Sequence, residues 1–467
     1  YTVNQGSISE TPAGSVGIDY SRRLGKPGRT MSIQVNGDYG ESQNDLSILT
    51  AGLTEELAIP GALINGLQTQ DRQSTNRTYG ASFEFEEPLS DSWRVETEIN
   101  YVADQVEGNY LFQLEEERVN NILTRNWNQA SASAALVRTF GQRNNLSIEA
   151  QAFTGELDLM GDVNRSTRFN YILPNLRLRL RSKKGFYNLR FSGNPQAPSI
   201  AQLQTIAEPG TSGRVTVGNP DLTPAVSYNG SGFMWFNDQF RALSANVNLS
   251  AGYTDNAFGN ELTFTEGQQI YRTVNVSHAW TTNLYLGTTI GVDAINGELR
   301  MSGRAGGSQG QGFVDGESRN NITTNYQGEI SLTTELNEKS FLKAGYTYGQ
   351  NRNTFDDDDA DVIKTVTHDL LAQFELEISK VWRLESRFNY RIFEAAAFAG
   401  AATVPDLQAS LEIRPFKKSG HFFRLSAFDI FDQNTVIYRQ AQAFVTSETT
   451  SDALGLYFLG TFHYKIK

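Results

Sequence analysis

The sequence contains no cysteine among its 467 residues. Disulfide bonds, thiolate catalysis and cysteine-ligated metal centres are therefore excluded. No stretch approaches the ~18 to 20 consecutive apolar residues that a membrane-spanning helix needs, and only 39% of the residues are hydrophobic. The polar start YTVNQGSISET does not resemble a secretory signal. A helical membrane protein is thus excluded, whereas a β-barrel, which shows lipid only every second side chain, is not.

Positive charge is also scarce. The 40 lysines and arginines are outnumbered by 52 acidic residues, which gives a net charge of −12 and argues against nucleic acid as a partner. Proline is rare, with 12 residues, whereas glycine (41), phenylalanine (28) and tyrosine (19) are plentiful. Aromatic strands punctuated by glycine are typical of all-β proteins.

Apolar and polar residues alternate along the whole chain. In NLRLRLR, Leu176, Leu178 and Leu180 share one face of a strand, and Arg177, Arg179 and Arg181 share the other. The same pattern recurs around residues 81–86, 243–253, 370–378, 382–392 and 456–466. About nineteen strands can be counted in this way, whereas a soluble β-sandwich has about seven to nine. We therefore expect leucines to face lipid and arginines to face a wet lumen.

Short and long connections also alternate, as in outer-membrane barrels with short periplasmic turns. Trp93 and Trp382 directly follow short turns, where an aromatic girdle is expected. The short turns are Gly25–Gly28, Glu87–Ser92, Gly141–Asn144, Ser182–Gly185, Asn237–Gln239, Asn337–Ser340 and Lys417–Gly420. The long segments, which we expect to be loops, are 39–72, 104–125, 194–224, 255–270, 303–320, 350–361 and 430–452. The sequence thus predicts a single domain over residues 1–467, an all-β, antiparallel transmembrane β-barrel.

The barrel is expected to be incomplete. The first strand, about Gly14–Arg23, and the last strand both run toward the side of the short turns. A barrel with both termini periplasmic begins with an upward strand, so an odd number of strands is missing. Three more would give 22, the number in plugged outer-membrane transporters, although parity alone also allows one.

Three blocks and the chain end carry a family resemblance: Ser21–Asp45 (SRRLGKPGRTMSIQVNGDYGESQND), Val217–Asn229 (VGNPDLTPAVSYN), Arg424–Arg439 (RLSAFDIFDQNTVIYR) and the closing YFLGTFHYKIK. They resemble the Bacteroidetes-type outer-membrane β-barrel family related to TonB-dependent receptors. The resemblance implies a regulatory-like domain and a plug ahead of a 22-stranded barrel, and sometimes a surface lipoprotein lid. Neither of these domains precedes Tyr1 in this sequence, which also contains no TonB-box-like segment. It also ends at Lys467, where the family usually ends in an aromatic residue.

No enzyme constellation stands out, and we expect no catalytic residue, no cofactor and no metal site. Ser308 lies in GGSQG, which matches a nucleophile-elbow pattern but lacks the required strand before and helix after it. We interpret that match as chance. The histidines, His278, His368, His421 and His463, have no second ligand at metal-binding spacing.

Three long segments have specific interpretations. The acidic run Asp356–Asp361 offers oxygen ligands for Ca²⁺ but lacks the glycine and offsets of an ordered calcium loop, so a solvated loop is favoured. The apolar segment 46–67 is either a short amphipathic helix that covers the mouth or meets a partner protein, or a segment that folds on its own barrel rim. The segment 194–224 is interpreted as structural.

Mixed charges are expected on the lumen face: Arg177, Arg179, Arg181, Arg190, Arg383, Arg387 and Arg391, with Glu84, Glu86, Glu375 and Glu377. They either line a substrate path or form ion-paired ladders that stiffen the wall and hold a plug.

The leading functional hypothesis is import of an iron chelate, oligosaccharide, peptide or vitamin across the bacterial outer membrane, driven by the TonB system. The alternatives are a scaffold barrel within an envelope complex and a passive channel. Membrane lipid is the expected partner in each case, and the residues upstream of Tyr1 would separate the first two. The sequence names no substrate-binding residue.

Overall fold

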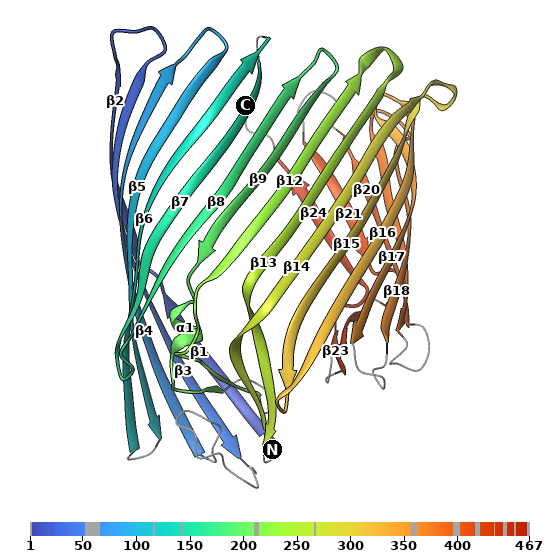
Figure 1. The fold of residues 1–467 in the computed structure, drawn as a ribbon. Helices are drawn as coiled ribbons and strands as arrows, with labels where there is room; N and C mark the ends of the chain where they lie inside the picture. The colour runs from blue at the N-terminus through green and yellow to red at the C-terminus, as the bar shows by residue number, and fades with distance from the viewer. Residues whose placement is uncertain are drawn as a thin grey trace.

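The computed structural model describes residues 2–51, 66–114, 117–141, 143–209, 214–265, 268–355, 362–395, 402–415, 421–433, 435–441, 446–452 and 454–464. It is almost entirely β-structure (Figure 1). Its helical elements are α1 (Ile200–Leu203), η2 (Gln239–Arg241) and η3 (Asp293–Ile295). None of the helices in this part of the chain is long and apolar enough to cross a membrane.

The strands follow one another along the chain with few interruptions. The first group is β1 (Thr2–Glu10), β2 (Ala13–Arg23), β3 (Thr30–Ala51), β4 (Gly66–Pro88), β5 (Trp93–Leu114), β6 (Glu117–Phe140), β7 (Asn144–Gly161), β8 (Arg165–Arg181) and β9 (Gly185–Gln196). The middle group is β10 (Glu208–Pro209), β11 (Arg214–Val217), β12 (Ala225–Asp238), β13 (Leu243–Thr265), β14 (Gln268–Val292), β15 (Gly297–Val314) and β16 (Glu317–Asn337). The last group is β17 (Ser340–Phe355), β18 (Ile363–Glu377), β19 (Trp382–Ala395), β20 (Ala402–Ile413), β21 (Phe422–Phe428), β22 (Thr435–Ala441), β23 (Thr446–Asp452) and β24 (Tyr457–His463).

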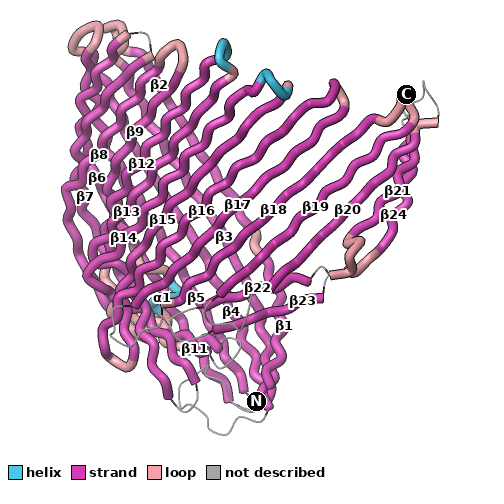
Figure 2. The backbone as a smooth tube through the Cα atoms, turned by 90° about the vertical axis from the view of Figure 1, so that its right-hand side faces the viewer, coloured by secondary structure: helices cyan, strands magenta, loops and turns pink. Residues whose placement is uncertain are grey.

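Antiparallel hydrogen bonding joins neighbouring strands from β3 to β9, then from β12 to β21, and finally β21 to β24. Both β1 and β2 pair with β3, so they form one interrupted strand. With that pair counted once and β10 and β11 set aside, the 22 strands of the sheet reduce to a ladder of nineteen. The ladder curves into a barrel-like wall (Figures 1 and 2), which confirms the predicted fold class. The hairpin of β22 and β23 is separate from it.

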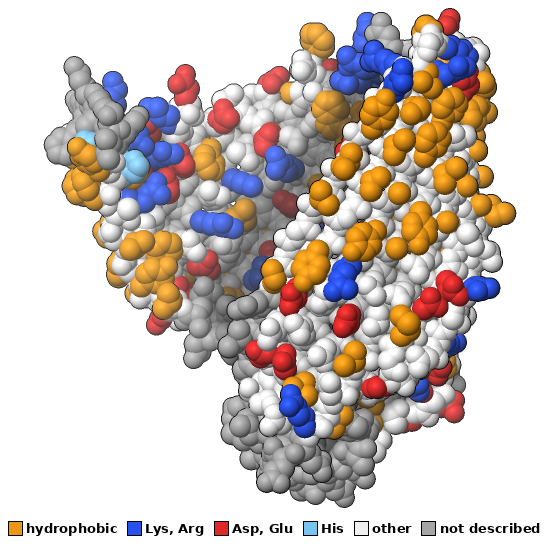
Figure 3. Space-filling view, turned by 90° about the vertical axis from the view of Figure 1, so that its left-hand side faces the viewer, with side chains coloured by type: hydrophobic (Ala, Val, Ile, Leu, Met, Phe, Trp, Pro, Cys, Tyr) orange, Lys and Arg blue, Asp and Glu red, His pale blue; other side chains and the backbone are white. Residues whose placement is uncertain are grey.

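The ladder has two edges, β1 with β2 on one side and β24 on the other. No pairing joins them among the described residues. The side chains of β2 and β24 are exposed along their whole length, and Figure 3, which faces this seam, shows the molecule hollowed there. Because antiparallel strands alternate and the ladder has an odd number, β2 and β24 run in the same direction, as the sequence predicted.

Most segments expected to be long loops are hairpins of long strands. The described residues of 39–72, 104–125 and 255–270 lie within paired strands, and so does 303–320 apart from its tight turn at Asp315 and Gly316. The longest of these strands, β14, has 25 residues, whereas roughly 9 to 11 cross a bilayer. The loop prediction was wrong because strand ends beyond the membrane meet water on both faces, so the alternation disappears there.

The short turns lie together at one end of the wall and the long hairpins at the other (Figure 1). The predicted short turns connect consecutive strands, apart from Lys417–Gly420, which lies outside the described residues. Trp93 and Trp382 are the first residues of β5 and β19, at the short-turn rim, as expected for a girdle. At the long-hairpin end, Asp315 and Gly316 have φ angles of 48° and 85°, the mirror-image turn that favours Asp-Gly.

Large apolar side chains cover the outer face of the wall (Figure 3). They lie opposite one another on adjacent strands, as Ile33, Phe83 and Ile99 do. Ile172 is 81% exposed on this face. Outer positions alternate with polar neighbours, such as Ser82 and Glu84, that point to the concave face. This band is the lipid-facing surface of a membrane barrel.

Leu249, which is half exposed in the outer band, tests this assignment. The substitution Leu249→Arg places a charge in lipid, and we expect it to lower the free energy of unfolding in bilayers by roughly 2 to 4 kcal/mol. The adjacent control, Asn248→Arg, faces the lumen and should change it far less. Urea titrations of both variants refolded into vesicles measure the difference, and equal losses would contradict the assignment of the two faces.

Candidate functional site: the lumen wall and its inner segment

The connection between β9 and β12, residues 197–224, is here called the inner segment; its residues 210–213 are not described. One part of it packs against β5 and β6, and another pairs with β14. These strands lie far apart around the ladder. A short connection reaches both only across the concave face, so the inner segment lies inside the lumen at the long-hairpin end (Figure 1).

Helix α1 begins the inner segment with a capping box. The Gln202 backbone N–H donates to the Ser199 hydroxyl over 3.3 Å, and the Ser199 N–H donates to the Gln202 side chain over 2.9 Å. This reciprocal pair satisfies two donors at the start of the helix. Ile200 and Leu203 are buried against Leu123 of the lumen wall. The S-x-x-Q spacing was visible in the sequence, but the surface on which the helix packs was not.

Arg125 anchors the start of the inner segment. It projects from β6, is only 8% exposed, and donates to the Pro198 carbonyl over 3.0 Å. Its guanidinium also forms an ion pair with Asp104 of β5. A buried cation needs both kinds of partner to offset its lost hydration.

Glu208 provides a second anchor. Its carboxylate accepts a 2.7 Å hydrogen bond from the Gln204 side chain and forms a 3.2 Å ion pair with Arg72 of β4. The inner segment is thereby joined to β4 as well.

Asn219 fastens the far end of the inner segment to β14. Its amide donates to the Thr273 carbonyl over 3.0 Å and accepts from Arg272 over 3.1 Å. Next to it, β11 forms a parallel pairing with β14. The inner segment is therefore tethered at both ends, which fits the interpretation of 194–224 as structural and corrects its expected place in an outer loop.

Gly218 lies where the inner segment crosses itself. A Cβ at this position would come within 2.1 Å of the Gln204 carbonyl oxygen, so only glycine permits the crossing. We expect Gly218→Ala to destabilise the inner segment by about 1 to 3 kcal/mol. Limited proteolysis should show faster cleavage in residues 197–224. Gly310→Ala, where a Cβ meets nothing within 4 Å, is the matched control, and equal cleavage of the two variants would contradict the crossing.

A trough of about 1110 Å³ runs along the lumen face of β9 and β12–β18. Its lining is rich in neutral amides, including Asn248, Asn283 and Gln327. Arg304 and Asp369 are the charged residues among those lining it. The trough therefore offers many hydrogen-bond donors and acceptors with little net charge.

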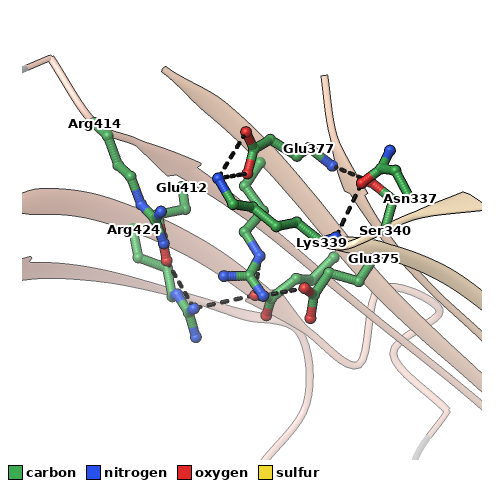
Figure 4. A network of polar contacts seen from close by, with 10 residues as sticks. Asn337, Lys339, Ser340, Glu375, Glu377, Glu412, Arg414 and Arg424 are labelled. Atoms are coloured by element: carbon green, nitrogen blue, oxygen red, sulfur yellow. Dashed lines mark hydrogen bonds and ion pairs between the residues drawn. The ribbon is translucent and has the colours of Figure 1, made fainter. Parts of the chain in front are cut away.

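The lumen face of β18–β21 carries an ion-paired ladder (Figure 4). Arg383 pairs with Glu375 and, at 3.5 Å, with Glu385. Arg424 bridges Glu385 at 3.2 Å and Glu412 at 2.9 Å. The ladder continues with pairs of Arg391 to Asp369, Lys339 to Glu377, and Arg414 to Glu412. The prediction of paired charges is confirmed here for Arg383, Arg391, Glu375 and Glu377.

The other predicted lumen charges are arranged differently. Glu84 and Glu86 accept hydrogen bonds from Ser32 and Thr30. No ion pair is found for Arg177, Arg179, Arg181, Arg190 or Arg387 within the described ranges.

The weaker motifs occupy unremarkable places. Ser308 lies inside β15, between Thr281 and Thr323, so the expected loop is a strand without a following helix. His278 contacts Ser277, and His368 contacts Tyr346. His421 and His463 stack on Tyr464 and Phe422. The described residues contain no group of three metal-ligating side chains. Asp356–Asp361 and most of 46–67 fall outside them.

A hollow antiparallel wall with an apolar outer face and a polar lumen defines a β-barrel of the outer-membrane type. The chain belongs to the outer membrane protein beta-barrel family, which it matches over residues 22–464. It is accordingly a protein of the bacterial outer membrane, in contact with its lipid.

Solved structures of similar shape include the copper transporter OprC, 11% identical with a TM-score of 0.39, covering 98% of this chain and 80% of that one. The ferric preacinetobactin receptor BauA from Acinetobacter baumannii is 11% identical with a TM-score of 0.40, covering 98% and 78%. The ferric yersiniabactin uptake receptor FyuA from Yersinia pestis is 10% identical with a TM-score of 0.35, covering 98% and 79%. At these values the similarity assigns neither substrate nor mechanism. No curated protein matches the chain.

Proposed function

We propose that this chain is the barrel of an active importer that moves a scarce nutrient across the outer membrane with energy from the TonB system. The observation that carries the proposal is the width of the polar lumen. Barrels of 16 to 18 strands already leave an aqueous channel, and 22-stranded ones are plugged. A wall of nineteen strands with only the inner segment inside it would leak, so a further occupant is required.

The two unpaired edges of the ladder support the presence of further strands, which is part of the same proposal. Unpaired backbone groups at β2 and β24 are costly in lipid because no water is present to bond them. Three additional strands would pair antiparallel with both edges and complete a barrel of 22. The occupant is then a plug, which gates the lumen and forms part of the binding site.

The proposed role is binding and transport rather than catalysis. The inner segment narrows the long-hairpin end, which faces the exterior if the short turns are periplasmic. The trough below it supplies hydrogen-bonding groups along the path. These features do not select among iron chelates, oligosaccharides, peptides and vitamins, and no partner beyond TonB is assigned.

Growth of a deletion strain tests the proposal. Cells lacking the protein should fail to grow when one nutrient class is limiting, and deletion of TonB should reproduce the same defect. A nutrient defect that persists without dependence on TonB would favour a passive channel. Loss of an envelope complex with no nutrient defect would favour a scaffold, and either result would overturn active import.

A further inference from the structure

Acidic side chains face one another on two lumen strands near the short-turn end. Glu84 on β4 lies directly opposite Glu98 on β5, and Glu86 lies opposite Glu96. We call these four residues the acidic patch. Arg94 pairs with Glu96 at 2.6 Å, and the other three carboxylates have no ion pair among the described residues. Like charges directly opposite each other destabilise a sheet.

Basic side chains gather in the same way on β8 and β9. Arg177 lies directly opposite Arg190, and Arg179 and Arg181 follow Arg177 on the same face. These four arginines form the basic patch. The buried Nε of Arg179 has no hydrogen-bond partner. Glu149 of β7 lies between the patches, opposite Asn175, and no ion pair joins it to either patch in the described part of the chain.

The two patches contrast with the ladder on β18–β21, where Arg383 and Arg424 each bridge two glutamates. The same wall therefore neutralises charge on one side and segregates it on the other. Because both patches place like charges in register, each leaves a repulsion that an external group of opposite sign would relieve.

The separation of the patches indicates the size of the occupant. The facing strands of the two patches, β5 and β8, are three steps apart, which span roughly 14 Å along the wall. A small solute cannot contact both patches at that distance, whereas a folded domain can. The intervening strand β6 carries the small side chains of Ser131, Ser133 and Ala135 on the same face, so no bulky side chain of β6 stands between the patches.

We propose that the two patches fix the orientation of a folded protein domain lodged in the lumen. This domain turns a basic surface toward β4 and β5 and an acidic surface toward β8 and β9. Reversed or rotated placements bring like charges together, so one rotational setting is favoured. The inference rests on the proposed function, since the domain is the plug of the importer, and it adds how the wall holds that plug.

Labelling of a cysteine in the complete protein, purified from outer membranes, tests the inference. Ser133→Cys places a thiol between the patches, and its reaction with a hydrophilic maleimide is followed by peptide mapping. Two further variants neutralise the patches in this background: Glu84→Gln with Glu98→Gln, and Arg177→Gln with Arg190→Gln. The control removes the exposed lumen pair Glu298 and Arg300, 3.6 Å apart on β15, by Glu298→Gln with Arg300→Gln. Lys380→Cys, in an exposed turn, gives the rate of an open thiol.

We expect Ser133→Cys to react much more slowly than Lys380→Cys. Neutralising either patch should raise its rate by at least about tenfold, equivalent to roughly 1.4 kcal/mol, and the control should leave it unchanged. If the thiol stays protected in both patch variants, the lumen is occupied but the patches do not hold the occupant. That result would overturn the inference about the patches and leave the proposed function intact. If it reacts as fast as Lys380→Cys from the start, the lumen is open and the proposed function fails with it. Retained heat-modifiable mobility on gels confirms that each variant has folded.

Discussion

Replacing Leu203 with alanine is expected to release the inner segment from the lumen wall. Leu203 has no exposed surface and packs against Leu123, Leu159 and Leu222. Truncating a buried leucine leaves a cavity and typically costs about 2 to 5 kcal/mol. Because the inner segment is a small unit joined to the wall, this loss should appear as local opening rather than as unfolding of the barrel.

Hydrogen exchange of the amides in residues 197–224 measures that opening. Exchange in the variant should rise by more than tenfold, while the amides of β15 and β16 keep their protection. Ile172→Ala, at a position that is 81% exposed on the outer face, provides the control and should leave the inner segment protected. If Leu203→Ala exchanges at the wild-type rate, the inner segment is not held by this contact.

Arg125→Leu is the second substitution with a large expected effect. It leaves the Asp104 carboxylate without its cation and the Pro198 carbonyl without its donor. Removing one member of a buried pair costs 3 to 5 kcal/mol in general. We expect roughly 3 kcal/mol here, because 20% of the Asp104 side chain remains exposed.

A double-mutant cycle separates the pair from the packing of its side chains. The combination of Arg125→Leu with Asp104→Leu should recover much of the loss, since no charge is then left unpaired. As a control, Arg168→Leu breaks the ion pair between Glu156 and Arg168, whose side chain is 82% exposed. This change should lower the free energy of unfolding by under about 1 kcal/mol. An Arg125 variant no worse than this exposed control would contradict the anchoring role.

The membrane-crossing part of the wall could be predicted from sequence because lipid imposes a strict period of two. The leucines and arginines of 175–181 fall on opposite faces, and the strand count and the common direction of the first and last strands follow from such runs. Each strand shows this alternation in its own sequence, so the strand can be predicted without knowing which distant residues it contacts.

The long hairpins and the inner segment could not be predicted in this way. Beyond the membrane both strand faces meet water or pack on other segments, and the period fades. Leu203 resembles any apolar loop residue until β6 and β7 are known to lie against it. The pairing of Arg383, and the lack of a paired acid for Arg177 in the described part of the chain, likewise depend on which residues lie opposite them, and the strand register sets that.

The intact mass of the protein purified from outer membranes tests the central claim, a plugged import barrel, most directly. Three more strands and a plug add a domain's worth of chain to this sequence. The account predicts a mass well above the 51.9 kDa of these 467 residues. A mass of 51.9 kDa would mean a barrel with no strands to pair its edges and no plug of its own, and would contradict the account.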